Sequence, residues 1–427
     1  MSATTTVTVP ATPFPVEALR AQFPALARAG SFVFFDNAAG AQIPQSVLDA
    51  VNLHLLEHNV QRGGRYAQSL AVDRTIQRGR ERVATFLNAR RPEEIAFGMN
   101  ATSFIRILSL ALGQTLGKRN EIIVTDLDHA ANVATWLALQ PMGAKLRLWR
   151  MRDDGCLHRE DLEPLLNSRT RLVACALASN ALGSVLDVRP VADAVHAVGG
   201  ELFLDAVHYA PHAPIDVQAL DCDYLVCSGY KIFAPHMGFL WGRYEKLAAL
   251  PTFREEFIPD MPPGKIEAGT FVYENVAGMA AAIDYLGLLG RTLAGRSAPR
   301  DPDDCSWEDL RLAMSGIQAY EQGLSRELLR VLRDAGADIY GICDDARLAE
   351  RVPTVCFNLP GVPPAVVTIA AADAGIGIRD GHMYSPSLMQ RLGLPFESGA
   401  VRVSLVHYNT VAEIARFREA LRSCGLR

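Results

Sequence analysis

The sequence predicts an α/β fold in which a large domain with a mainly parallel, seven-stranded sheet is followed by a smaller α+β domain. Two observations support this prediction. Continuously apolar runs such as IIVT, LVACAL and YLVC alternate with amphipathic stretches, and such runs are typical of strands buried on both faces of a parallel sheet. After Trp241 the pattern changes to loops, long helices and short strands, which indicates a second unit.

The first part of the chain carries most of the predicted strands. Apolar and β-branched runs place them at Phe32–Phe35, Glu94–Phe97, Glu121–Thr125, Lys145–Arg150, Arg171–Leu177, Glu201–Asp205, Tyr224–Cys227 and Gly238–Trp241. Amphipathic spacing predicts helices at Ala71–Leu87, Ser103–Leu116, Ala131–Leu139 and Val188–Val198.

The last part of the chain reads differently. A loop at Met261–Gly264 precedes a helix over Glu274–Leu289 and a polar, proline-containing loop over Gly295–Cys305. A long helix from Trp307 leads to the remaining elements, which are strands at Thr354–Asn358, Ile376–Arg379 and Val401–Leu405 and a helix from Val411. We therefore expect a disordered tail over 1–12, a segment over 13–30 that packs on the small domain, the large domain over 31–290 and the small domain over 291–427.

Composition excludes several classes of protein. With 427 residues, 49% of them apolar and 21% charged, the chain is not disordered. The net charge is −5 and no stretch is strongly basic, so we expect no nucleic-acid partner. No apolar run approaches the roughly 18 residues of a membrane helix, since Ala277–Gly290 is interrupted by Asp284, and the N-terminus has no signal-like apolar region. The eight cysteines form no CxxC pair, which favours a reduced, cytoplasmic protein.

Polar side chains follow several of the apolar strands, where ligands bind in open parallel sheets. Lys231 ends the segment DYLVCSGYK, and it either reaches solvent or forms a Schiff base with a carbonyl cofactor. Asp205 follows ELFL and needs a partner, which is an ordinary cation, a helix cap or the pyridinium nitrogen of pyridoxal phosphate. Thr102 and Ser103 open a helix, as a plain N-cap or as an anion site.

Taken in order, these segments resemble the class V aminotransferases, which are fold type I pyridoxal phosphate enzymes, and most closely their cysteine desulfurase and selenocysteine lyase-like branch. The resemblance runs from about Phe14 to Leu426. It is carried by FFDNAAGAQIP, NVQRGGRY, DLDHAANVATW, SNALGS, LDAVHYAPHAPIDVQALDCDYLVCSGYK, EAGT and VRVSLVHYNT.

The resemblance implies roles for individual residues. Lys231 would hold pyridoxal 5'-phosphate as a Schiff base and then move protons at the substrate Cα. Asp205 would pair with the pyridine nitrogen, and His129 would stack on the ring and assist acid–base steps. The remaining cofactor contacts would come from His208 and Asn180 near the phenolic oxygen and from Ala101, Thr102, Ser228 and Tyr230 around the phosphate.

The resemblance also implies a substrate and an assembly. Arg402 would bind the carboxylate of an amino-acid substrate through its planar guanidinium group, with Arg379 as a weaker candidate. Thr270 would reach the phosphate bound by a neighbouring subunit, which implies a homodimer with shared active sites.

One position departs from the desulfurase pattern. In the loop RDGHMYSP, Tyr384 occupies the place of the nucleophilic cysteine, and the loop contains no cysteine. Tyrosine cannot form a persulfide, although it can donate a proton or shape the pocket. We therefore expect β-elimination or C–S lyase chemistry first, and amino-acid epimerisation or transamination next. Desulfuration with another sulfur acceptor, or a non-catalytic regulatory protein that binds the cofactor, stays an alternative.

Competing motifs are weaker. Ser228-x-x-Lys231 matches the acylating S-x-x-K motif, but the S-D-N and K-T-G motifs that accompany it are absent. The segment GIGIRDG has its third glycine one position late for a dinucleotide-binding fingerprint. His208 and His212 near Asp205, and the pair His54 and His58, do not complete a metal-ligand set in the sequence, so we expect no metal.

Overall fold

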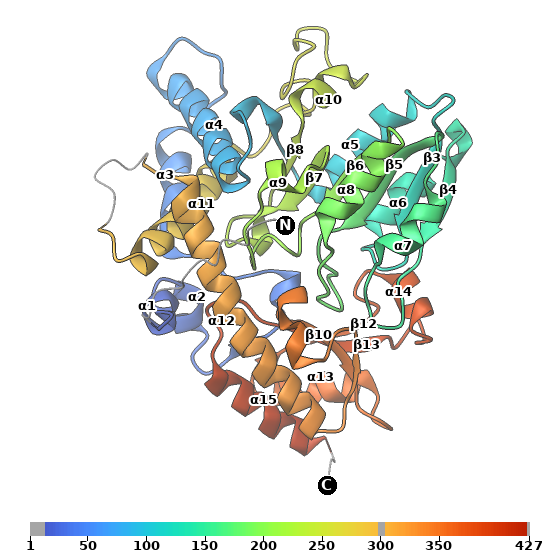
Figure 1. Ribbon diagram of the computed structural model, residues 1–427. Helices are drawn as coiled ribbons and strands as arrows, with labels where there is room; N and C mark the ends of the chain where they lie inside the picture. The colour runs from blue at the N-terminus through green and yellow to red at the C-terminus, as the bar shows by residue number, and fades with distance from the viewer. Residues whose placement is uncertain (1–12, 298–303, 425–427) are drawn as a thin grey trace.

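The computed structural model describes residues 13–297 and 304–424, so the expected tail over 1–12 lies outside the described residues. A seven-stranded sheet forms the centre of the larger part (Figure 1). Its order is β2 (Ile95–Gly98), β8 (Gly238–Gly242), β7 (Tyr224–Ser228), β6 (Glu201–Asp205), β5 (Thr170–Ala176), β3 (Glu121–Thr125) and β4 (Lys145–Trp149). Only β8 runs antiparallel to its neighbours, so the sheet is mainly parallel as predicted.

Both faces of this sheet are covered by apolar cores. In β3, Ile122 and Val124 pack with side chains of α5 (Ala101–Gly113) and α6 (Ala131–Leu137). Ile123 faces the opposite core, which includes α8 (Val188–Ala197) and α4 (Ala67–Phe86). This two-sided burial explains why the strands read as continuous apolar runs.

Two long helices lead from the larger part to the second sheet. Helix α11 (Tyr273–Leu293) packs on α12 (Trp307–Asp334), and a Cβ on Gly290 would lie 1.7 Å from the carbonyl oxygen of Asp309, so glycine permits their close approach. Helix α12 then reaches a four-stranded sheet in the order β12 (Arg379–Gly381), β13 (Ala400–Ser404), β10 (Thr354–Asn358) and β9 (Asp338–Tyr340) (Figure 1). Helices α13 (Pro364–Asp373) and α15 (Val411–Ser423) complete this second core.

The described chain has further, shorter helices. They are the α-helices α1 (Val16–Arg20), α2 (Pro24–Arg28), α3 (Gln45–Glu57), α7 (Arg159–Leu162), α9 (Val217–Leu220), α10 (Tyr244–Ala249) and α14 (Pro386–Arg391), and the 3-10 helices η1 (Asn37–Ala39), η2 (Pro92–Glu94), η3 (Gln140–Met142), η4 (Glu163–Leu165), η5 (Gly229–Lys231) and η6 (Asp345–Glu350).

The strand expected at Phe32–Phe35 forms outside the large sheet. As β1 (Val33–Phe34) it pairs in parallel with β11 (Ile376–Gly377), and Val33 and Phe35 are buried in the core of the four-stranded sheet. The reason is a pairing partner more than 340 residues away in the chain, which no local pattern indicates. The expected boundary between residues 290 and 291 falls inside α11.

The N-terminal segment contacts the last part of the chain. The ring of Phe14 stacks on that of Tyr320 at 4.5 Å, and Arg20 forms an ion pair with Glu413 at 3.0 Å. Its residues Leu19 and Phe23 are buried in the core of the larger part.

Helix α11 differs from the expectation that no segment approaches the length of a membrane span. Among the described helices it alone is long and apolar enough to cross a membrane. Most of its apolar window is buried in the protein, where α11 packs on α3, α4 and α12. Its Asp284 forms ion pairs with Arg78 and Arg82. The helix therefore belongs to the protein core of this fold.

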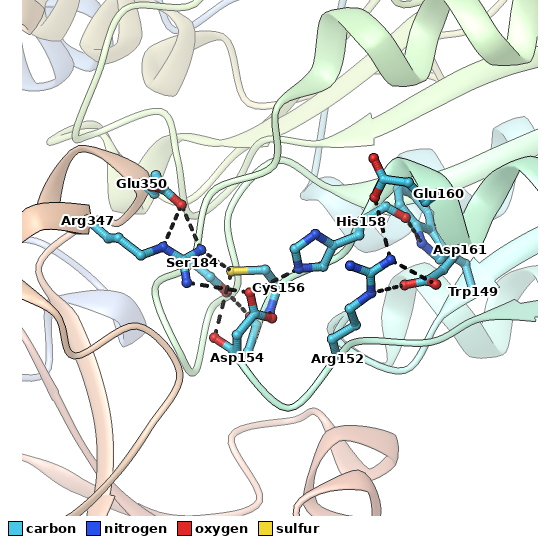
Figure 2. Close-up of polar contacts among 11 residues, drawn as sticks. Trp149, Arg152, Asp154, Cys156, His158, Glu160, Asp161, Ser184, Arg347 and Glu350 are labelled. Carbon is cyan, nitrogen blue, oxygen red and sulfur yellow. Dashed lines mark hydrogen bonds and ion pairs between the residues drawn. The ribbon is translucent and has the colours of Figure 1, made fainter.

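A polar cluster joins the loop after β4 to η6 (Figure 2). Arg347 contacts Asp154 at 3.4 Å and the sulfur of Cys156 at 3.5 Å, while Asp154 also contacts His158 at 2.9 Å. Ser184 donates a hydrogen bond to the carbonyl oxygen of Gly155 at 2.7 Å. These contacts fix the second sheet against loops that border the site described next.

Candidate active site

A cavity lies at the carboxyl ends of β5, β6 and β7, where ligands bind in open parallel sheets. Nine of the predicted site residues line it, namely Ala101, Thr102, His129, Asn180, Asp205, His208, Ser228, Tyr230 and Lys231. The structure thus brings together residues that are spread over 130 positions of the sequence.

Lys231 ends the short helix η5 directly after β7 and is 6% exposed. Within the described chain no carboxylate lies within ion-pair distance of its Nζ. Burial, with the charge of Arg402 as a smaller cause, lowers the pKa of Lys231 to about 8. At pH 7 about a tenth of this amine is therefore neutral, far more than for a lysine of ordinary pKa, and the neutral amine is the nucleophile.

Asp205 is the last residue of β6 and is buried. Its Oδ1 accepts a hydrogen bond from the backbone N–H of Val207 at 3.0 Å. Burial raises the pKa of Asp205, whereas the charge of Lys231 lowers it. Among the described residues no guanidinium or ammonium group pairs with this carboxyl group on the cavity wall, so it suits a ligand that brings its own cation.

The N-terminus of α5 forms one end of the cavity. Asn100 caps the helix by accepting a hydrogen bond from the N–H of Ser103 at 2.8 Å, and the N–H of Ala101 contacts Oγ of Ser228 at 3.3 Å. A Cβ on Gly238 would lie 2.5 Å from the carbonyl carbon of Asn100, so glycine allows β8 to approach this turn. Helix N–H groups and nearby hydroxyls suit an anion such as a phosphate.

His129 lies in the turn between β3 and α6. Its Nδ1 accepts a hydrogen bond from the N–H of Ala131 at 3.1 Å. Burial, followed by the charges of Lys231 and Arg402, lowers the pKa of His129 to about 4. The ring is therefore neutral near neutral pH and carries its proton on Nε2.

Asp128 is a site residue that the sequence analysis missed. Its carboxylate accepts hydrogen bonds from the hydroxyl of Thr125 and from the side-chain amide of Asn132, the latter at 2.8 Å. Burial is the largest cause that raises the pKa of Asp128 to about 7. The signal that could have identified it was an acid directly before His129, just after the apolar strand Glu121–Thr125.

Asp36, also missed, bridges both predicted arginines. Its Oδ1 accepts a hydrogen bond from Arg402 at 2.9 Å, and its Oδ2 accepts two from Arg379, at 3.0 and 2.9 Å. Arg402 also donates to the carbonyl oxygen of Asn180 at 3.0 Å, and its buried Nε has no partner in the described protein. Neither arginine lines the cavity itself, but Arg402 contacts its wall at Asn180.

The loop that carries Tyr384 is held by backbone contacts. Met383 and Tyr384 both have left-handed conformations, with φ of 52° and 57°, which are unfavourable for these residue types. The side chain of Asn180 compensates by donating to the carbonyl oxygen of Met383 at 2.7 Å and accepting from Ser385 at 3.1 Å. The N–H of Ala130 donates to the carbonyl oxygen of Tyr384 at 2.7 Å.

These contacts place the Tyr384 ring 5.7 Å from the ring of His129, with the tyrosine 55% exposed. They also occupy the side chain of Asn180, which the resemblance placed near the cofactor's phenolic oxygen. Thr270 is exposed, contacts Gln61 at 2.7 Å and lies outside the cavity. Among the described residues no group of three or more His, Cys, Asp or Glu side chains is placed to hold a metal ion; His212 instead pairs with Glu321 at 2.8 Å and His208 with Thr354 at 2.9 Å.

Comparisons with known proteins agree with this arrangement. The model of the aminotransferase class-V family matches residues 33–296 and 307–417. The chain is 34% identical to the aminotransferase-like protein FGM3 of Gibberella zeae, with 96% of this chain and 98% of that protein covered. It is 32% identical to a probable cysteine desulfurase of Synechocystis sp., with 92% and 90% covered.

Solved structures give the same result. A cysteine desulfurase from Thermococcus onnurineus aligns with a TM-score of 0.84 and 26% identity, covering 96% of this chain and 98% of that one. The cysteine desulfurase CsdA from Escherichia coli aligns with a TM-score of 0.79 and 27% identity, covering 97% and 99%.

Proposed function

The chain belongs to the class V aminotransferase family, and from this premise we propose that it is a pyridoxal phosphate-dependent C–S lyase that acts on a cysteine-like amino acid by β-elimination. The observation that carries the choice of elimination over desulfuration is Tyr384. It occupies the place of the nucleophilic cysteine on a loop that Asn180 and Ala130 hold to the cavity wall.

The residues of the cavity fit the cofactor. Lys231 would bind it covalently, Asp205 would pair with its ring nitrogen, and the start of α5 with Ser228 and Tyr230 would hold its phosphate. His208 supports this fit, because it lines the cavity and its buried Nδ1 has no hydrogen-bond partner among the described residues. When bound, pyridoxal phosphate withdraws electrons from the substrate so that bonds at Cα and Cβ break heterolytically.

The side chains of the chain supply the proton transfers. Lys231, whose pKa is lowered, would remove the proton from the Cα of a substrate held by the cofactor. The ring of His129 is neutral and would stack on the cofactor ring, and Arg402 would orient the substrate carboxylate. Tyr384 would donate a proton to the leaving group, and its exposure would let solvent restore that proton.

We also propose a homodimer in a cytoplasmic setting. Thr270 is exposed and lies outside the cavity of its own chain, which supports a role at the phosphate bound by a second subunit. Large apolar side chains such as Phe253, Phe257 and Met99 are 94%, 81% and 74% exposed, more than a lone soluble subunit favours. Sedimentation analysis of the loaded protein should therefore give twice the mass of one chain.

Product analysis tests the proposed function. The cofactor-loaded protein is incubated with L-cysteine and a thiol, and Lys231→Ala serves as the inactive control. Pyruvate and free sulfide in equal amounts support β-elimination, whereas alanine as the product contradicts it and favours desulfuration. Without either product, loss of optical activity or formation of a keto acid from other amino acids favours epimerisation or transamination. A cofactor spectrum that no amino acid changes favours a regulatory role.

A further inference from the structure

His208 and Thr354 form a contact between the two sheets at the wall of the cavity. His208 follows β6 of the large sheet, and Thr354 is the first residue of β10 in the four-stranded sheet. Nε2 of His208 lies 2.9 Å from Oγ1 of Thr354, and both residues are buried. This contact ties a cavity residue to β10, whose described residues do not line the cavity themselves.

The position of Thr354 is fixed by its backbone. Its N–H donates to the carbonyl oxygen of Val352 at 2.8 Å, and its carbonyl oxygen accepts from Arg351 at 2.5 Å. Since β10 also pairs with β13, with Thr354 opposite Ser404, the backbone cannot turn to point the hydroxyl elsewhere. The hydroxyl is thus held at the histidine ring.

The other nitrogen of the His208 ring, Nδ1, is buried and has no hydrogen-bond partner in the described protein. An unpaired polar atom in the interior is costly. Because His208 lines the cavity, the missing partner is expected from a ligand in that cavity.

The groups around His208 keep its ring neutral. Burial, followed by the charges of Lys231, His212 and Arg402, lowers the pKa of His208 well below its usual value. The ring of His212 lies 5.4 Å away, its own pKa is lowered to about 3 by burial, and its Nδ1 is paired with Glu321. A neutral imidazole carries its proton on only one of its two nitrogens.

We propose that Thr354 is a positioning residue that places this proton on Nδ1, where it is donated to the phenolic oxygen of the cofactor. In the described protein the hydroxyl of Thr354 has no other hydrogen-bond partner, so its proton finds an acceptor only when Nε2 is unprotonated, and the ring proton then lies on Nδ1. In the opposite tautomer the lone pair of Nδ1 would face an ionised oxygen, which is itself only an acceptor. This inference rests on the proposed function, because it requires pyridoxal phosphate in the cavity.

The test is a pH titration of the visible absorbance of the cofactor-loaded protein. A hydrogen-bond donor at the phenolic oxygen stabilises that oxygen in its ionised form. It therefore lowers the apparent pKa of the proton shared between the oxygen and the Lys231 nitrogen. Loss of the donor therefore raises the apparent pKa of the titration, by about one unit for one hydrogen bond to a charged oxygen. Thr354→Val should show this rise, while Thr354→Ser, which keeps the hydroxyl, should titrate like the wild type.

A double-mutant comparison separates positioning from general packing. His208→Gln supplies an amide N–H that needs no partner at position 354, so adding Thr354→Val to it should leave the apparent pKa unchanged. The inference is overturned if Thr354→Val alone titrates like the wild type, or if it shifts the pKa equally in both backgrounds. Failure of the proposed function would look different, because the wild-type protein would then show no visible absorbance that Lys231→Ala removes.

Discussion

Replacing Lys231 by methionine should stabilise the cofactor-free protein at neutral pH. Lys231 is buried without an ion-pair partner in the described chain, and burial is the main cause that lowers its pKa from 10.5 to about 8. That difference corresponds to about 3 kcal/mol of unfavourable free energy for holding the charged amine in the folded state. Methionine has a similar length and needs no solvation, so Lys231→Met removes this cost.

The pH dependence of the gain follows from the sign of the shift. Between pH 8 and 10.5 the unfolded chain holds a proton that the folded amine has already lost, so wild-type stability rises with pH in this window. The gain from Lys231→Met should therefore be full below pH 8, decline from pH 8 to 10.5 and vanish above.

Urea unfolding of the cofactor-free proteins at pH 7 and at pH 10 measures both values. Lys265→Met is the matched control. Lys265 is equally buried, but it donates to the carbonyl oxygen of Ala248 at 2.9 Å and pairs with Asp260 at 2.6 Å, so its loss should destabilise by about 1–3 kcal/mol. A Lys231→Met protein that is less stable than the wild type at pH 7 would refute the reasoning, since it would mean that the buried amine is fully compensated.

Two further predictions concern the walls of the site. Arg402→Lys keeps the charge but loses the planar guanidinium group, so kcat/KM for the amino-acid substrate should fall about 10- to 100-fold in steady-state kinetics. An unchanged value would mean that another residue binds the substrate carboxylate. Asn180→Ala removes the hydrogen-bond partner of the Met383 carbonyl oxygen and of the Ser385 hydroxyl. Local stability of the loop should fall by about 1–3 kcal/mol, so amide hydrogen exchange in residues 382–385 should accelerate. Unchanged exchange would show that the N–H of Ala130 holds the loop alone.

Local patterns in the sequence were sufficient to predict most of the fold. The strands of the large sheet are buried on both faces, so each reads as an apolar run with a clear end, and Glu121–Thr125 and Glu201–Asp205 form with the predicted bounds. Cavity residues such as Asp205 and Lys231 were found because a charged residue at the end of such a run is conspicuous.

The rest depends on contacts between distant segments. Asp36 lies 343 positions from Arg379, and its neighbours in the sequence give no sign that two arginines share its carboxylate. Thr354 reads as an ordinary strand residue, since only the packing of β10 on the loop after β6 brings its hydroxyl to His208. Met383 and Tyr384 have left-handed backbone conformations, and because neither is glycine, the sequence does not indicate this turn.

The carboxylate of Asp36 is chemically the same group that an amino-acid substrate brings to Arg402. It is attached to the protein, so it competes at an effective concentration in the millimolar range or above, which dilution cannot lower. A free carboxylic acid or inorganic anion has to displace the Asp36 carboxylate from Arg402. It replaces one ion pair by another and therefore gains little binding free energy. Under the proposed function an amino acid would gain more, because its amine would also bond to the cofactor at Lys231. The site would then select for the amine and the acid together, before any chemistry at Cα begins.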